Sequence, residues 1–151
     1  MTALTTEEFT TWANRLANLP WPMTTGEFAK IATGEFGWTI FDGDQVLTAT
    51  FSNCSERVLV GTDLGDKVSD SLFPLGRAGS KGHVDKTLLN DLFVEYVKVG
   101  SEAWGEPFKR EHGKKPLMAW NHPSGCILQI VRTRSLVLFT FFTPQGARYY
   151  E

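Results

Sequence analysis

The side chains of this chain that could do chemistry are two thiols, three imidazoles and a set of carboxylates. Cys54 or Cys126 could act as a nucleophile only with a histidine brought from a distant part of the chain. His83, His112 and His122 stand in no HExxH spacing and lie near no cysteine in a zinc-like pattern. Free cysteine more often packs as a small apolar residue. We therefore expect no catalytic residue, no metal site, no cofactor and no enzyme activity.

Five aspartates form two groups in the first half of the chain: Asp42, Asp44, Asp63, Asp66 and Asp70. Paired carboxylates could serve a hydrolase or hold a cation. The first two are explained better as residues of a hairpin turn. The other three fit either a solvated loop or an acidic patch that faces a basic partner. We take all five as candidate partner-binding residues.

Charge divides the chain, whose net charge is −2. Residues 1–70 hold ten Asp/Glu against four Lys/Arg, and residues 71–151 hold seven against eleven. The segment Lys109–Lys115 is the basic cluster, with Arg132 and Arg134 as possible additions. It lacks the interleaved aromatic residues that stack bases. We interpret it as a solvated loop and expect no nucleic-acid partner.

The elements that position these residues follow from periodicity. Thr5–Glu8 and Thr24–Glu27 have the pattern of helix starts, and each precedes an apolar stripe at helical spacing. The longest predicted helix covers 84–104. Strands are predicted at 38–41, 45–52, 57–62, 117–122, 126–133 and 135–143. Residues 63–82, rich in glycine, are predicted to form a long functional or mobile loop.

The predicted fold class is α+β, with an antiparallel sheet of about six strands in the order ααβββαβββ. Consecutive strands joined by short turns pair antiparallel, and the helices gather mainly on one face. The strand at Leu136–Phe142 is apolar on both faces, which favours a central strand with helices on both sides. The alternative is a sheet face offered to a partner or to a second copy of the chain.

Bulk composition favours a single domain over residues 1–151. A hydrophobic content of 42% and a charged content of 21% are ordinary for a globular protein. No apolar run reaches the length of a membrane span, and the N-terminal residues lack the basic start and apolar stretch of a signal peptide. We expect no membrane partner and a cytoplasmic location.

Several structural motifs resemble those of a family of small uncharacterised actinobacterial proteins. They are Trp21–Pro22 before the second helix start, Phe36–Trp38, Trp104–Pro107 and Trp120. Proteins of this type resemble immunity proteins of polymorphic toxin or contact-dependent growth inhibition systems. The resemblance implies a partner, the C-terminal toxin domain of a cognate protein, which the chain would neutralise by occluding its active site. It implies no catalytic residues.

The order of helices and strands also resembles that of type III secretion chaperones. This resemblance implies the alternative function, a chaperone that holds a client polypeptide on its sheet face. A chaperone of this kind is expected to be a homodimer.

Overall fold

The helices begin where the sequence supplies capping residues. The computed structural model describes residues 2–80 and 82–150. In helix α1 (Thr6–Ala17), Thr5 accepts the amide of Glu8 at 3.1 Å, and the Glu8 carboxylate accepts the amide of Thr5 at 3.0 Å. Helix α2 (Thr25–Gly34) repeats this capping box with Thr24 and Glu27. Both predicted helix starts are confirmed.

Two further helices follow. Helix α3 (Lys86–Trp104) begins after Asp85, whose carboxylate accepts the amide of Leu88, and it ends at Gly105, which has a φ of 85°. Helix α4 (Pro144–Ala147) is a single short turn near the C-terminal end. No helix within the described residues is long and apolar enough to cross a membrane.

The main sheet is open and entirely antiparallel, and it has nine strands in the described part of the chain. Eight follow the order β2-β3-β4-β5-β11-β10-β9-β8, and β1 pairs with the end of β5. Their bounds are β1 (Thr2–Ala3), β2 (Thr39–Asp42), β3 (Val46–Thr50), β4 (Ser55–Thr62), β5 (Val68–Arg77), β8 (Lys109–Glu111), β9 (Leu117–Asn121), β10 (Ile127–Arg132) and β11 (Leu136–Phe142). A separate hairpin joins β6 (Gly79–Ser80) to β7 (His83–Val84).

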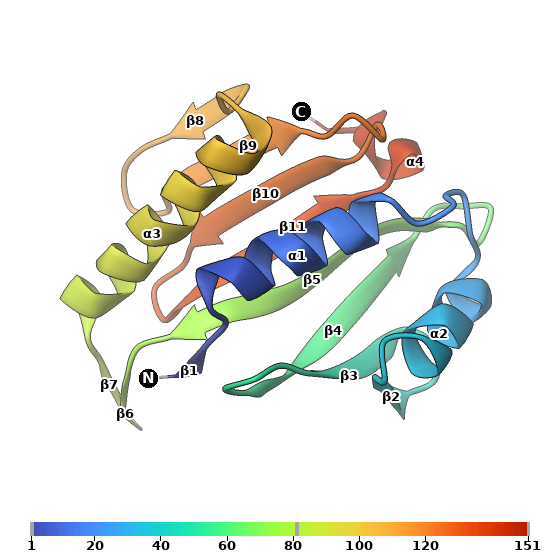
Figure 1. Cartoon of the computed structure of the whole chain (residues 1–151), viewed down its shortest axis with the longest axis horizontal. Helices are drawn as coiled ribbons and strands as arrows, with labels where there is room; N and C mark the ends of the chain where they lie inside the picture. Colours follow the sequence, from blue (N-terminus) through green and yellow to red (C-terminus); the bar gives the residue numbers. More distant parts are fainter. Residues whose placement is uncertain (1, 81, 151) are drawn as a thin grey trace.

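The helices α1, α2 and α3 lie on one face of this sheet (Figure 1). Helix α1 crosses the centre of the sheet beside α3, while α2 covers the end that contains β2 and β3. An aromatic cluster fills the space between the layers. The Phe9 ring of α1 lies 5.5 Å from Phe139 of β11 and 5.4 Å from Tyr96 of α3. Within the described residues, the opposite face carries none of these three helices, and we call it the helix-free face.

The α+β class and the antiparallel sheet are confirmed, and the six predicted strands correspond to β2, β3, β4, β9, β10 and β11. The predicted number of strands and the predicted order of elements are wrong, because the described residues form further strands. The long loop predicted at 63–82 contains the central strand β5. Pro74 is tolerated there because the register between β5 and β11 shifts beside it, with Leu138 opposite Pro74 and Val137 opposite Gly76. Gly76 is needed because a β-carbon there would lie 3.1 Å from that of Ala3 in β1.

Two further expectations need correction. The basic segment at 109–115 is only partly a loop, because Lys109–Glu111 form the edge strand β8. The apolar strand β11 is central, as predicted, but helices cover only one of its faces. Val137, Phe139 and Phe141 are fully buried beneath the helices. The alternating side chains face the helix-free side.

Candidate protein-binding site

The helix-free face of the sheet is defined by the register of its strands. One row across it runs Val46, Leu59, Leu72, Thr140, Gln129, Ala119 and Lys109. A second row runs Pro74, Leu138, Val131, Leu117 and Glu111. Aliphatic side chains therefore form the centre of this face, and charged side chains stand at its β8 edge.

Apolar side chains on the β2–β4 side of this face remain accessible. Leu59 is 46% exposed and Phe41 is 59% exposed. The guanidinium carbon of Arg57 lies 3.8 Å from the centroid of the Phe41 ring, which is a cation–π contact. Arg57 thus places a positive charge on this part of the face. Uncovered aliphatic and aromatic side chains of this kind are typical of surfaces that bind other proteins.

The five candidate aspartates come to one end of the sheet. Asp42 ends β2 and Asp44 lies in the β2–β3 turn, while Asp63 and Asp66 lie in the β4–β5 turn. These two turns are at the same end because β3 pairs with β4, and the amide of Val60 donates to the carbonyl of Gln45. The structure thus brings together two acidic groups that are about twenty residues apart in the sequence.

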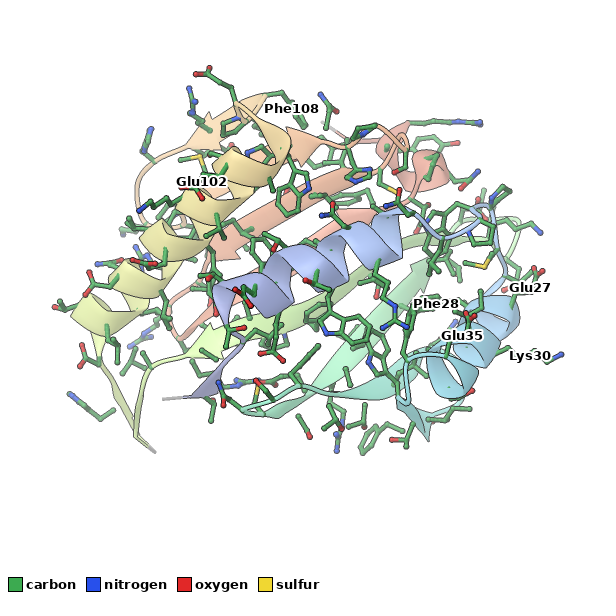
Figure 2. All side chains as sticks on the ribbon, in the orientation of Figure 1. Glu27, Phe28, Lys30, Glu35, Glu102 and Phe108 are labelled. Carbon is green, nitrogen blue, oxygen red and sulfur yellow. The ribbon has the colours of Figure 1, made fainter. Side chains whose placement is uncertain are left out.

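Glu27 adds a sixth carboxylate at the same end (Figure 2). The turns meet α2 there, since Thr24 forms an isolated bridge with Lys67. Hydrogen bonds from Thr24 hold the pKa of Glu27 below its usual value. Glu27 therefore stays charged over a wider pH range than an ordinary glutamate.

Three of the aspartates have structural roles. The Asp44 carboxylate accepts a hydrogen bond from the Thr25 hydroxyl at 3.0 Å. Asp63 shapes its own turn by accepting the amides of Gly65 at 2.8 Å and Lys67 at 3.0 Å. Asp66 adopts a φ of 64°, a conformation that Asp and Asn tolerate better than most residues. The predicted hairpin turn at Asp42 and Asp44 is confirmed, and Asp63 and Asp66 belong to a second short turn.

Asp63 and Asp70 also line a hollow on the helix-free side, at the acidic end. Its volume is about 880 Å³. The acidic members share it with apolar and aromatic groups from the C-terminal segment, and the full lining is Thr62–Gly65, Ser69, Asp70, Phe142, Gly146, Tyr149 and Tyr150. Leu64 is fully exposed and Tyr149 is 79% exposed. We call this feature the acidic hollow.

Asp70 is held at the base of the acidic hollow by its neighbours on the sheet. It stands opposite Gly61 on β4, and a β-carbon at Gly61 would lie 2.5 Å from the Asp70 carboxylate. The Ser69 hydroxyl donates to that carboxylate at 2.8 Å. The absence of a side chain at position 61 is therefore what makes room for the acid.

The C-terminal segment forms the other wall. The Tyr150 hydroxyl donates to the side-chain carbonyl of Gln129 on β10 at 2.5 Å, and the Tyr150 ring packs edge-on against Phe142. Burial raises the pKa of Tyr150, and the negative charge of Glu111 adds to this effect. Tyr150 is thus a neutral, anchored side chain, while the neighbouring Tyr149 projects into solvent.

Of the other candidate residues, the structure brings His122 and Cys126 into one turn, where the Ser124 hydroxyl oxygen lies 2.8 Å from His122 Nδ1 and accepts the amide of Cys126 at 3.4 Å. Cys54 and Cys126 are free thiols whose pKa values are raised, chiefly by burial, which disfavours the reactive thiolate. The His122 ring nitrogen Nε2 lies 3.2 Å from the side-chain oxygen of Asn14, in a packing contact between α1 and the β9–β10 turn. No group of three possible metal ligands occurs among residues 2–80 and 82–150.

Sequence reasoning missed the aromatic half of the acidic hollow. Tyr149 and Tyr150 belong to no recognisable sequence pattern, and they line the same hollow as Asp63 because α4 docks against β5. Gly146 allows that docking, since a β-carbon there would collide with the backbone carbonyl of Ser69. The one signal that could have located the hollow was the apolar residue Phe142 on the second face of β11.

Comparison with known proteins adds a family but no activity. No curated protein and no solved structure matches the chain. One family model matches residues 7–143, a range that begins at the second residue of α1, includes α2 and α3, and ends just beyond β11. The matched residues identify the chain as a member of DUF6301, a family of unknown function.

Proposed function

We propose that this chain is an immunity protein that binds a cognate toxin domain and covers its active site. The observation that carries the proposal is the acidic hollow, in which Asp63 and Asp70 stand beside Leu64 and Tyr149 on the side of the sheet opposite α1, α2 and α3. An exposed aromatic ring and an aliphatic side chain supply the kind of anchor found at binding hot spots. Neighbouring carboxylates supply charge complementarity.

The charge of this end selects the class of toxin. Carboxylates from the β2–β3 turn, the β4–β5 turn and α2 create a negative potential, which attracts a positively charged surface and speeds association with it. A toxin that cleaves nucleic acid needs a basic active-site cleft. We therefore take a nuclease-like domain as the partner, with its basic cleft covered by the acidic end and its rim resting on the helix-free face.

A charge-neutral variant tests this proposal. The triple substitution Asp63→Asn, Asp66→Asn and Asp70→Asn keeps the shape of the β4–β5 turn, because the asparagine side-chain oxygen at position 63 still accepts the two turn amides and asparagine tolerates a positive φ at position 66. A matched control removes three negative charges from the exposed surface of α3, by Asp91→Asn, Glu95→Gln and Glu102→Gln. Glu102 is labelled in Figure 2.

Each variant is expressed with an affinity tag in the native cell, and captured proteins are identified by mass spectrometry. The expected result is one stoichiometric partner with a toxic C-terminal domain, bound by the wild type and by the α3 control but lost from the triple variant. Co-expression must also rescue cells from that toxin domain. Equal binding by the triple variant would refute the assigned contact, and failure of rescue would refute the immunity function.

The second candidate function is a secretion-type chaperone, and the exposed side chains of Leu59 and Phe41 on the β2–β4 side of the helix-free face favour it. A chaperone would hold an extended client on the helix-free face and would use a second copy of the chain to limit exposure of that face. Light scattering on a sizing column distinguishes the two proposals. A dimer that binds many clients weakly supports the chaperone, whereas a monomer with one tight partner supports the immunity protein.

A further inference from the structure

A second hollow lies at the opposite end of the sheet from the acidic turns. Its volume is about 560 Å³, and it is lined by Lys86, Asn90, Lys114, Lys115, Arg132 and Arg134. Five of the six side chains are cationic and none is acidic. Pairing of Leu136 with Arg77 and of Phe142 with Asp70 places the β10–β11 turn and the acidic turns at opposite ends of the strands. We call this feature the basic hollow.

Three separate parts of the fold supply the cations. Lys86 and Asn90 stand four residues apart in the first turns of α3, on the same side of the helix. Lys114 and Lys115 belong to the connection between β8 and β9. Arg132 ends β10 opposite the buried Val137, which directs it toward the helix side of the sheet. Folding concentrates positive charge that is spread over about fifty residues of sequence.

None of these cations forms an ion pair within the described part of the chain. The ion pairs of the described residues are Arg77 with Glu56 and Arg110 with Glu106, and neither involves the basic hollow. The Nε of Arg132 is buried and has no hydrogen-bond partner within the described part of the chain. A buried donor without an acceptor is costly, so Arg132 carries an unmet hydrogen bond in the wall of the basic hollow.

We propose that the basic hollow binds a small soluble molecule that carries two or more phosphate groups. Its volume falls within the range of small-ligand sites, which is roughly 300–1,000 Å³. The two guanidinium groups can each bind phosphate oxygens in pairs, and the lysines add point charges. No aromatic side chain lines the basic hollow, so the ligand is recognised by its phosphates and not by a stacked base.

Isothermal titration with inorganic tripolyphosphate and with inositol hexakisphosphate tests the proposal on the full chain. We expect saturable binding of one molecule per chain, weakened by salt. The double variant Lys114→Gln and Arg134→Gln changes two exposed residues of the hollow and should lower affinity by at least about tenfold, since hydrogen bonds between charged groups are lost. The control is Lys30→Gln and Lys98→Gln, which removes two exposed charges elsewhere and should bind like the wild type.

A charge-conserving variant separates a built site from general electrostatic attraction. Arg132→Lys keeps the positive charge but removes the paired donors, so affinity should fall although net charge does not change. Thermal unfolding confirms that each variant is folded. If Arg132→Lys fails to fold, the affinity of the Lys114/Arg134 variant still tests whether the basic hollow binds the ligand. Equal loss of affinity in the Lys30/Lys98 control would overturn the proposal. Binding only to an acidic peptide, or only to vesicles with phosphoinositide headgroups, would also overturn it.

Discussion

Two helical glycines should respond to the same substitution with opposite signs. Gly34 is the exposed last residue of α2, and a β-carbon there would meet nothing within 4 Å. Gly100 is buried inside α3, and its β-carbon would lie 2.8 Å and 2.9 Å from Cη2 and Cζ2 of Trp120 and 3.2 Å from the ring of Trp104. Carbon atoms in good contact are about 3.5–4.0 Å apart.

The expected magnitudes follow from these distances. Alanine in place of glycine in a helix gains roughly 0.5–1 kcal/mol because the unfolded chain loses freedom. Gly34→Ala should therefore stabilise the protein by about 0.5 kcal/mol. At Gly100 the gain is opposed by overpacking, which costs about 1–3 kcal/mol. The upper end of this range of costs applies because the Trp120 ring cannot move away: it is fully buried, and its indole N–H donates to the carbonyl of Gly105 at 3.0 Å. The net loss should be about 2 kcal/mol.

Urea unfolding measures both changes, provided that the slope of free energy against urea is the same in each variant. A double-mutant cycle identifies the cause. Trp120→Phe removes the atoms that clash, so Gly100→Ala in that background should lose most of its penalty. A Gly100→Ala protein as stable as the wild type, or a penalty unchanged by Trp120→Phe, would refute the close packing of α3 on β9.

Three further predictions concern the stability of the helix layer. Tyr96→Phe should cost about 1–2 kcal/mol in urea unfolding, because the Tyr96 hydroxyl donates to the buried carbonyl of Leu4 at 2.7 Å, and an undiminished stability would contradict this. Thr5→Ala should cost about 1 kcal/mol by loss of the α1 cap, with a matching loss of helical circular dichroism on heating. Burial lowers the pKa of His122, so its contribution to stability is full above the unfolded pKa of about 6.5 and is lost as pH falls below it. The free energy of unfolding should therefore be higher at pH 7.5 than at pH 5.5, and His122→Gln should make this difference smaller. If the difference is the same in His122→Gln as in the wild type, burial of His122 does not cause it.

Local signals were enough to predict most helices and strands. The capping residues Thr5 and Thr24 predicted the starts of α1 and α2, because a helix start depends on contacts within four residues. The continuous apolar runs of β10 and β11, bounded by turn residues, predicted strands for the same reason. Residues 68–77 were misread because Pro74 and Gly76 are turn formers in isolation, and only the neighbouring strands show that they occupy a register shift and a close approach.

The candidate sites depend on long-range contacts and were less accessible to sequence reasoning. The aspartates were found because acidic residues stand out in a sequence, but their meeting at one end depends on the pairing of β3 with β4. Tyr149 could not be placed, because its position follows from the docking of α4. The basic hollow combines Lys86, Lys115 and Arg132, and no local pattern connects these three residues.

Site-specific photo-crosslinking in the native cell tests the central claim most directly. A crosslinking amino acid replaces Tyr149, which is 79% exposed at the acidic hollow, or Val94, which is 63% exposed on α3. If the acidic hollow and the helix-free face bind a polypeptide partner, the probe at position 149 should give one crosslinked protein that is absent or much weaker at position 94. Crosslinks from position 94 alone, or equal crosslinking at both positions, would contradict this account.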